Sequence, residues 1–274
     1  MAIVGIFDSG LGGLLTAQLV HSKRPDLSLL YYGDTAHLPY GDKSASQIRT
    51  YVSDIVHFLR LQGAEIIAIA CNTASAVAYD VACEAAGDIP VLSAIYPALN
   101  AFAERHFPEP VGIIGTYTTI RSGIYGESLR KMGYTVRELA TPVLVPLIEE
   151  GWIEHPATTA AIHSYLSELG EIGTLLLACT HYPLLQNQIR NYYAELGREV
   201  HILSTAALLA EAIIRETTPE IMQNPSASTR FWVSDANPRF LELANRFWGK
   251  AIVLKEVRAD GLTASVSGEL SRVR

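Results

Sequence analysis

Two stretches decide the fold of this chain: Ile66-Ile67-Ala68-Ile69-Ala70-Cys71-Asn72-Thr73 and Thr174-Leu175-Leu176-Leu177-Ala178-Cys179-Thr180-His181. In each of them an aliphatic run leads to a cysteine, and a small polar cluster then opens a helix-like pattern. A short aliphatic run of this kind is typical of a buried strand in a parallel sheet. We therefore expect two copies of one strand–turn–helix unit, with the two cysteines facing each other across a cleft.

Around these stretches, strand-like runs alternate with helix-length amphipathic segments, which is typical of parallel βαβ units. We expect strands at residues 3–7, 29–32, 91–94, 111–115, 200–203, 230–233 and 251–254, besides the two that lead to the cysteines. We expect a helix from about Leu14 and another behind the capping-box pair Ser44 and Gln47; two later helices should close at Gly133 and Gly197. Residues 141–151 are too rich in proline for a long regular element, 217–228 form a polar loop, and 259–274 lack clear periodicity.

Four of the expected strands end in polar residues: Asp8-Ser9, Cys71-Asn72-Thr73, 116–119 and Cys179-Thr180-His181. Ligands bind at the carboxyl ends of strands in open parallel sheets. Two sheets that face each other across a cleft account for these clusters best. The sequence thus predicts an α/β protein of two similar lobes, each a mostly parallel sheet flanked by helices, with the active site between them. Residues 1–97 and 206–274 should form the first lobe, and 98–205 the second.

The bulk composition narrows the class of protein. The 274 residues include 28 acidic and 21 basic side chains, and the net charge of −7 argues against nucleic acid as a main partner. The first residues lack the basic region of a signal peptide, and no apolar stretch approaches the ~18 residues of a membrane-spanning helix. Three cysteines do not make a disulfide framework. We therefore expect a cytoplasmic protein with reduced thiols and no membrane contact.

The two junction cysteines are candidates for acid–base chemistry on both sides of one substrate. A thiol at a strand-to-helix junction lies near free backbone N–H groups and the positive end of the helix dipole. Both features favour the thiolate, lowering a pKa that starts near ~8.5. The alternative is that each cysteine is only a small buried hydrophobe. Cys83, inside a helical pattern without polar neighbours, is expected to be structural in this sense.

Three further patterns indicate a function less strongly. Cys179 and His181 resemble half of a zinc site, but no second Cys/His pair stands at ligand spacing, so no metal is expected. The segment Asp8-Ser9-Gly10-Leu11-Gly12-Gly13 resembles a phosphate cradle, but Leu15 stands where the third glycine should be and there is no Walker lysine. A backbone nest for a carboxylate explains these glycines as well. Glu149 and Glu150 follow an apolar, proline-marked run, so one of them is a candidate inward carboxylate.

Taken together, four segments resemble the signature segments of the glutamate racemase family: Asp8-Ser9-Gly10, Pro39-Tyr40-Gly41, Ala70-Cys71-Asn72-Thr73-Ala74-Ser75 and Cys179-Thr180-His181-Tyr182-Pro183-Leu184. The resemblance runs from residue 3 to about residue 254, in the family's order and at its spacing. It implies an enzyme that interconverts L- and D-glutamate without a cofactor and supplies D-glutamate for peptidoglycan. It also implies glutamate as the small-molecule partner and assembly as a homodimer.

The resemblance assigns a role to each site residue. It places the catalytic thiols, Cys71 and Cys179, on opposite faces of the substrate's α-carbon, with Asp8, Glu149 and His181 in support and Glu149 acting on His181. It places substrate contacts at Asp8, Ser9, Tyr40, Gly41, Asn72, Thr73, Thr180 and His181. These assignments agree with the chemistry, because inverting a stereocentre by proton exchange needs a base on one face and an acid on the other.

Some positions depart from the family pattern. Thr141 stands where many members have a cysteine, and Ser204 where an aspartate is frequent. Neither belongs to the thiol pair, so we expect activity to be kept. The chain begins at its first strand, whereas members activated by a peptidoglycan precursor tend to carry an N-terminal extension, so such activation is not expected. Two other functions stay open: racemisation of aspartate or another amino acid, and a binding protein without catalysis, since some relatives are reported to bind DNA gyrase.

Overall fold

The aliphatic runs form parallel strands in this computed structural model, which describes residues 3–217, 227–236 and 238–259. One sheet has six strands, in the order β10 (Leu254–Glu256), β9 (Thr229–Val233), β2 (Ser28–Gly33), β1 (Ile3–Asp8), β3 (Ile66–Ile69) and β4 (Val91–Ser93). The other has four, in the order β6 (Val136–Ala140), β5 (Val111–Gly115), β7 (Thr174–Ala178) and β8 (His201–Ser204). All pairs are parallel, as in Val4 opposite Leu29 and Val111 opposite Thr174. The prediction of an α/β fold with two parallel sheets is confirmed.

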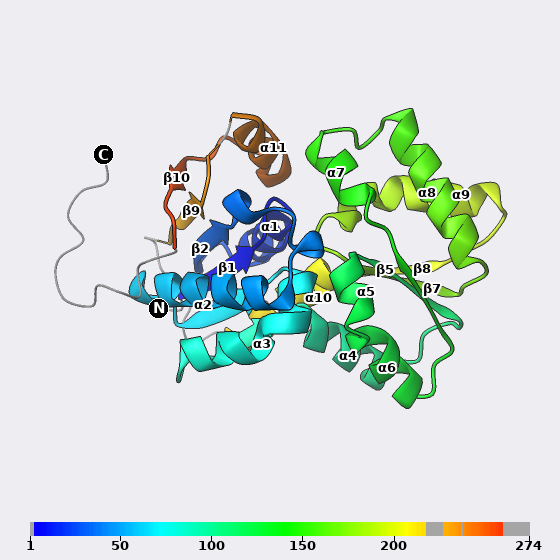
Figure 1. Cartoon of the computed structure of the whole chain (residues 1–274), viewed down its shortest axis with the longest axis horizontal. Coiled ribbons are helices and arrows are strands. Elements are labelled where there is room, and N and C mark those ends of the chain that lie inside the picture. Colours follow the sequence, from blue (N-terminus) through cyan, green and yellow to red (C-terminus); the bar gives the residue numbers. More distant parts are fainter. Residues whose placement is uncertain (1–2, 218–226, 237, 260–274) are drawn as a thin grey trace.

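Helices cover both faces of the six-stranded sheet. Alternate strand residues point to opposite faces, so that Val4 and Ile6 pack in one core while Phe7 packs in the other. The first core lies against α1 (Gly13–Lys23), α10 (Thr205–Glu216) and α11 (Pro238–Trp248), and the second against α2 (Ala45–Leu61) and α3 (Asn72–Ala86). Figure 1 shows this lobe on the left and the other on the right.

The four-stranded sheet is covered in the same way. One face packs on α7 (Leu144–Glu149), α8 (Pro156–Leu169), the 3-10 helix η3 (Tyr182–Leu185) and α9 (Gln186–Glu195). The other packs on α4 (Ile95–Glu104) and α6 (Ile124–Lys131), and α5 (Tyr117–Arg121) follows β5. The strands divide between the sheets after β4 and again after β8. Lobe boundaries at residues 97/98 and 205/206 stay predictions, since α4 and α10 pack on each other between the two sheets.

Local signals in the sequence explain several helix starts. The capping box at the start of α2 is confirmed: the Ser44 side chain accepts from the Gln47 backbone N–H, and the Gln47 side chain accepts from the Ser44 backbone N–H. Residues 141–151 hold no long element, as expected, but they do contain the six residues of α7. Pro146 lies in the first turn of that helix, where a missing N–H costs no intrahelical bond.

Two edge strands, β6 and β10, do not lie where the sequence predicted a strand. β6 carries Arg137 and Glu138 and was not expected from the sequence at all. The strand expected at 251–254 lies instead at Leu254–Glu256, where two of its three residues are exposed. Each of these strands pairs on one side only, so neither needs the continuous apolar run that marks a central strand. The expected loop at 217–228 and tail at 259–274 fall mainly on residues 218–226 and 260–274, outside the described residues.

No helix in the described part of the chain has the length and apolar character that crossing a bilayer requires.

Candidate active site

The carboxyl ends of the two sheets meet at a cavity lined from both lobes. Its volume is about 570 Å³, including the part that opens to solvent. Most lining residues follow strands of the two sheets, and three belong to residues 142–146, which include the start of α7. They are Ser9, Leu38, Pro39, Tyr40, Gly41, Asp42, Cys71, Asn72, Thr73, Thr116, Tyr117, Pro142, Val145, Pro146, Cys179, Thr180 and His181. Both junction cysteines therefore border one cavity, from opposite lobes.

Cys71 lies at the junction of β3 and α3, where it caps the helix. Its sulfur accepts from the backbone N–H of Ala74 at 3.4 Å and donates to the Ser9 hydroxyl at 3.8 Å. The thiol is only 4% exposed. Burial, and next the negative charge of Asp8, raise the pKa of Cys71 to about 12, and the contacts with Ala74 and Ser9 offset this only in part. The expectation that the junction lowers the pKa of this thiol was wrong, because one N–H does not replace the water that burial removes.

Asp8 has no exposed surface and is not among the described residues that line the cavity. One carboxylate oxygen accepts from the backbone N–H groups of Gly10 and Gly13, at 3.1 and 3.0 Å. The nest formed by the glycine-rich segment thus binds the chain's own carboxylate. A side chain at Gly13 would place its Cβ 2.4 Å from the Asp8 Cβ, so this position must be glycine. The other oxygen of Asp8 accepts from the Thr180 hydroxyl at 3.2 Å, which joins the two lobes.

Cys179 lies at the end of β7 beside an imidazole. Its sulfur is 3.9 Å from Nδ1 of His181, and the opposite ring nitrogen is 3.1 Å from the Glu149 carboxylate at the end of α7. His181 is buried, and burial alone would lower its pKa. The hydrogen bonds with Cys179 and Glu149 outweigh that cost and raise the pKa of His181 well above its usual value. The His181 ring therefore lies between the Cys179 sulfur and the Glu149 side chain, and both contacts favour its protonated form.

The remaining expected substrate contacts are also at the cavity, but some are already hydrogen-bonded within the protein. The Asn72 side chain donates to Thr205 at 3.0 Å and accepts from the Tyr125 hydroxyl at 2.6 Å. The Thr73 hydroxyl contacts that of Thr116 across the lobes at 2.9 Å. The side-chain amide and carbonyl of Asn72 thus both have partners within the protein.

Tyr40 and Gly41 form part of the 3-10 helix η2 (Tyr40–Asp42) at the cavity wall. The Tyr40 hydroxyl donates to the Asp34 carboxylate at 2.5 Å, and the Gly41 carbonyl accepts from Thr118 of the second lobe at 2.8 Å. A Cβ at Gly41 would lie 3.0 Å from the Cβ of Thr116, so glycine allows the lobes to approach closely here.

The cavity also contains residues that the sequence did not single out as site residues. Thr116 was noted only as part of a polar strand end, and its hydroxyl contacts the Thr73 and Thr119 hydroxyls. The proline-marked run was expected to be irregular, and it supplies an apolar wall through Pro142, Val145 and Pro146. Thr116 could have been predicted as a site residue because it follows a strand end. No sequence signal predicted that Pro142, Val145 and Pro146 line the cavity.

Other positions noted in the sequence lie outside the cavity lining. Cys83 is half-buried within α3. Thr141 is buried and bonds the Tyr182 hydroxyl at 2.7 Å, while Ser204 caps α10 by accepting from Ala207 at 3.3 Å. Glu150 bonds Arg239 on the surface at 2.6 Å, so Glu149 is the inward carboxylate of that pair. The described ranges hold no group of three or more His, Cys, Asp or Glu side chains placed to bind a metal.

Comparisons with known proteins agree with one another. The family model described as Asp/Glu/Hydantoin racemase matches residues 15–213. The chain is 36% identical over 256 residues to the glutamate racemase of Syntrophus aciditrophicus (strain SB), covering 91% of this chain and 93% of that one. Its structure is similar to glutamate racemase of Francisella tularensis in complex with D-glutamate, with TM-score 0.84, 29% identity, and coverage of 94% and 98%. It is likewise similar to glutamate racemase of Thermus thermophilus in complex with beta-chloro-D-alanine, with TM-score 0.81, 33% identity, and coverage of 93% and 96%.

Proposed function

This chain belongs to the Asp/Glu/hydantoin racemase family, and from that premise we propose that it interconverts L- and D-glutamate without a cofactor. The observation that carries the proposal is the pair of cysteines that border one cavity from opposite lobes. The curated relatives at about this similarity are named glutamate racemases, which favours glutamate over aspartate. The reaction would supply D-glutamate for peptidoglycan synthesis.

The two thiols would work as a base and an acid on opposite faces of the α-carbon. In the direction from L- to D-glutamate, the Cys179 thiolate takes the α-proton and becomes a thiol. The electron pair of the broken C–H bond delocalises into the α-carboxylate, and Cys71 gives its proton to the other face and becomes a thiolate. The reverse reaction exchanges these roles. A raised pKa suits Cys71 to the first direction, because its thiol is protonated before substrate binds.

The supporting residues would set the charge of each thiol. His181, protonated between Cys179 and Glu149, stabilises a thiolate at Cys179. Asp8 acts on the other side, where its charge favours the protonated form of Cys71. His181 in the second lobe would thus favour a thiolate, whereas Asp8 in the first lobe would favour a protonated thiol.

The cavity would hold a dicarboxylate mainly by neutral donors, with the protonated His181 as the charged exception. None of the described lining residues is a lysine or an arginine, and the donors are hydroxyls, backbone N–H groups and His181. We propose Ser9, Tyr40, Gly41, Asn72, Thr73, Thr180 and His181 as the substrate contacts, with Asn72 contributing through its backbone. Asp8 would position Thr180 and the glycine-rich segment without touching the substrate.

The proposal is tested by α-proton exchange in deuterium oxide with purified protein and no added cofactor. L-Glutamate should exchange its α-hydrogen and racemise, and L-aspartate should do so far more slowly. Dialysis against a chelator should leave the rate unchanged, since the thiols supply both protonation states. Faster exchange of aspartate would reassign the substrate, and loss of activity on chelation would contradict the cofactor-free reaction.

We further propose a homodimer located in the cytoplasm, with no nucleic-acid partner, on the grounds of family resemblance and the net charge of −7. Sedimentation of the purified chain distinguishes a dimer from a monomer.

A further inference from the structure

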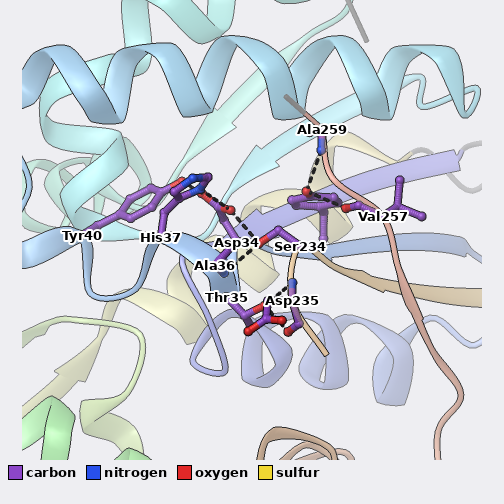
Figure 2. Close-up of polar contacts among 10 residues, drawn as sticks. Asp34, Thr35, Ala36, His37, Tyr40, Ser234, Asp235, Val257 and Ala259 are labelled. Atoms are coloured by element: carbon purple, nitrogen blue, oxygen red, sulfur yellow. Dashed lines mark hydrogen bonds and ion pairs between the residues drawn. The ribbon is translucent and has the colours of Figure 1, made fainter. Parts of the chain in front are cut away.

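A buried carboxylate connects the cavity to the C-terminal part of the chain. Asp34 follows β2 and is 2% exposed. Its oxygens accept from Tyr40 on the cavity side and from Ser234, which follows β9, on the other side. Figure 2 shows Asp34 between these two residues, with His37 beside it. Asp34 thus links the cavity-lining Tyr40 to Ser234, which lies 200 positions after Asp34 in the sequence.

Ser234 uses its hydroxyl twice. It donates to the Asp34 carboxylate at 2.8 Å and accepts from the Ala36 backbone N–H at 2.8 Å. Its own backbone N–H donates to the Gly33 carbonyl at 3.0 Å. The side chain is 2% exposed, so no water replaces these bonds without rearrangement. Ser234 therefore fixes both the backbone and the charged group of the loop that begins at Asp34.

The loop held in this way leads directly to the cavity wall. Asp34 also contacts Nδ1 of His37 at 2.9 Å, and the His37 ring stacks on Tyr51 with centroids 3.9 Å apart. The Tyr40 hydroxyl donates to the Asp34 side chain at 2.5 Å, and this hydrogen bond is buried. Tyr40 is 1% exposed yet lines the cavity. Its ring position depends on where Asp34 lies.

The same wall is confined from the second lobe. Thr118 bonds the Gly41 carbonyl at 2.8 Å, and Thr116 packs against Gly41. A loop held between two lobes has little room to adjust, so a displacement at Asp34 changes the shape of the cavity. Small misplacements of binding groups have large effects on catalysis.

We infer that Ser234 is a positioning residue for substrate binding: through Asp34 it fixes the Tyr40 hydroxyl and the Tyr40–Gly41 wall of the cavity. The inference rests on the proposed function. It makes the segment that follows β9 part of the substrate site, although neither β9 nor Ser234 is among the described residues that line the cavity.

The test compares Ser234→Ala with the matched control Tyr32→Phe. The Tyr32 hydroxyl donates to the Val257 carbonyl at 2.9 Å and accepts from the Ala259 N–H at 3.1 Å, so it holds the C-terminal segment through backbone groups at residues 257 and 259. Ser234→Ala should raise KM for L- and D-glutamate by about tenfold, the effect of losing one hydrogen bond to a charged group, with kcat nearly unchanged. Tyr32→Phe should lower the melting temperature comparably and leave KM unchanged. If Ser234→Ala does not fold, Ser234→Cys, with its weaker donor, replaces it.

A double-mutant cycle identifies the route of the effect. If Ser234 acts through Tyr40, adding Ser234→Ala to Tyr40→Phe should raise KM no further. Equal KM values for Ser234→Ala and wild type, or fully additive effects in the cycle, would overturn the inference. Absence of α-proton exchange in the wild type would instead overturn the proposed function, so the two failures are distinguishable.

Discussion

The junctions at residues 66–73 and 174–181 share one sequence pattern, but their thiols have different neighbours. Cys71 caps α3 and has the Asp8 carboxylate nearby, which together with burial raises its pKa to about 12. Cys179 lies beside His181, which Glu149 helps to keep protonated. The strand–turn–helix pattern fixes where each sulfur lies. His181, within the second junction, and Asp8 and Glu149, from other parts of the chain, make the electrostatic surroundings of the two sulfurs different.

The largest effect should come from removing either thiol. Cys71→Ser and Cys179→Ser each replace one proton-transfer group by a far weaker acid, so racemisation should fall by about 10²–10⁴-fold. The two variants should differ with a glutamate analogue that carries a β-leaving group. By family resemblance Cys179 faces the α-hydrogen of the L form, so Cys71→Ser should keep elimination from the L analogue and Cys179→Ser from the D analogue.

Cys83→Ser is the control for these variants, because its thiol is away from the cavity. It should change stability alone. Loss of turnover in Cys83→Ser with full activity in either of the others would refute the assignment of the thiols.

A smaller effect is expected when Cys179 loses its charged neighbours. Glu149→Gln keeps a polar partner for His181 but removes the negative charge, so the pKa of His181 should fall. The imidazolium is lost as pH rises through that pKa, and the high-pH limb of kcat/KM should therefore move to lower pH. We expect about a tenfold loss at neutral pH and about a 10²-fold loss in His181→Asn. Superimposable pH profiles of Glu149→Gln and wild type would show that the carboxylate does not act through His181.

The corresponding change in the first lobe is Asp8→Asn. The asparagine oxygen can accept from Gly10 and Gly13 while its amide donates to Thr180, so the fold should be kept. Without the carboxylate charge, the pKa of Cys71 should fall but stay raised, since burial is the larger cause. We expect less than about a tenfold loss of racemisation. Titration of thiolate absorbance in variant and wild type measures the shift. An unchanged Cys71 titration would show that the charge of Asp8 does not affect this thiol.

The last effect is absent at neutral pH and concerns stability in alkali. The pKa of the Cys71 thiol is about 12 in the folded chain, against 9.0 for the unperturbed group. Between those values the unfolded chain loses a proton that the folded chain keeps, so rising pH favours unfolding. This contribution is fully present below the lower value and lost above it, by up to about 1.4 kcal/mol per pH unit.

Urea unfolding at several alkaline pH values tests this slope. Cys71→Ala should lose stability less steeply than wild type, and Cys83→Ala should follow wild type. Parallel slopes for Cys71→Ala and wild type would mean that this thiol titrates alike in the folded and unfolded chains.

The sequence predicted the central strands and the positions of the polar strand ends, because buried parallel strands need continuous apolar runs and their ends are marked by Cys71 and Cys179. It did not predict β6 or the true position of β10, since an edge strand tolerates residues such as Arg137 and Lys255. The sequence also did not predict the raised pKa of Cys71. Burial and the approach of Asp8 arise only when distant segments pack together, and no local pattern reports them.

The order of the strands has a consequence for synthesis on the ribosome. The four-stranded sheet is continuous in sequence and all its strands have been made once β8 ends at Ser204. The six-stranded sheet begins with the first strand made, but the outer side of β2 stays unpaired until β9 emerges. The lobe that starts first is therefore finished last. Ser234 reaches Asp34 only at that stage, so a nascent chain stopped before β9 would hold both cysteines and lack the contact that sets the Tyr40 wall.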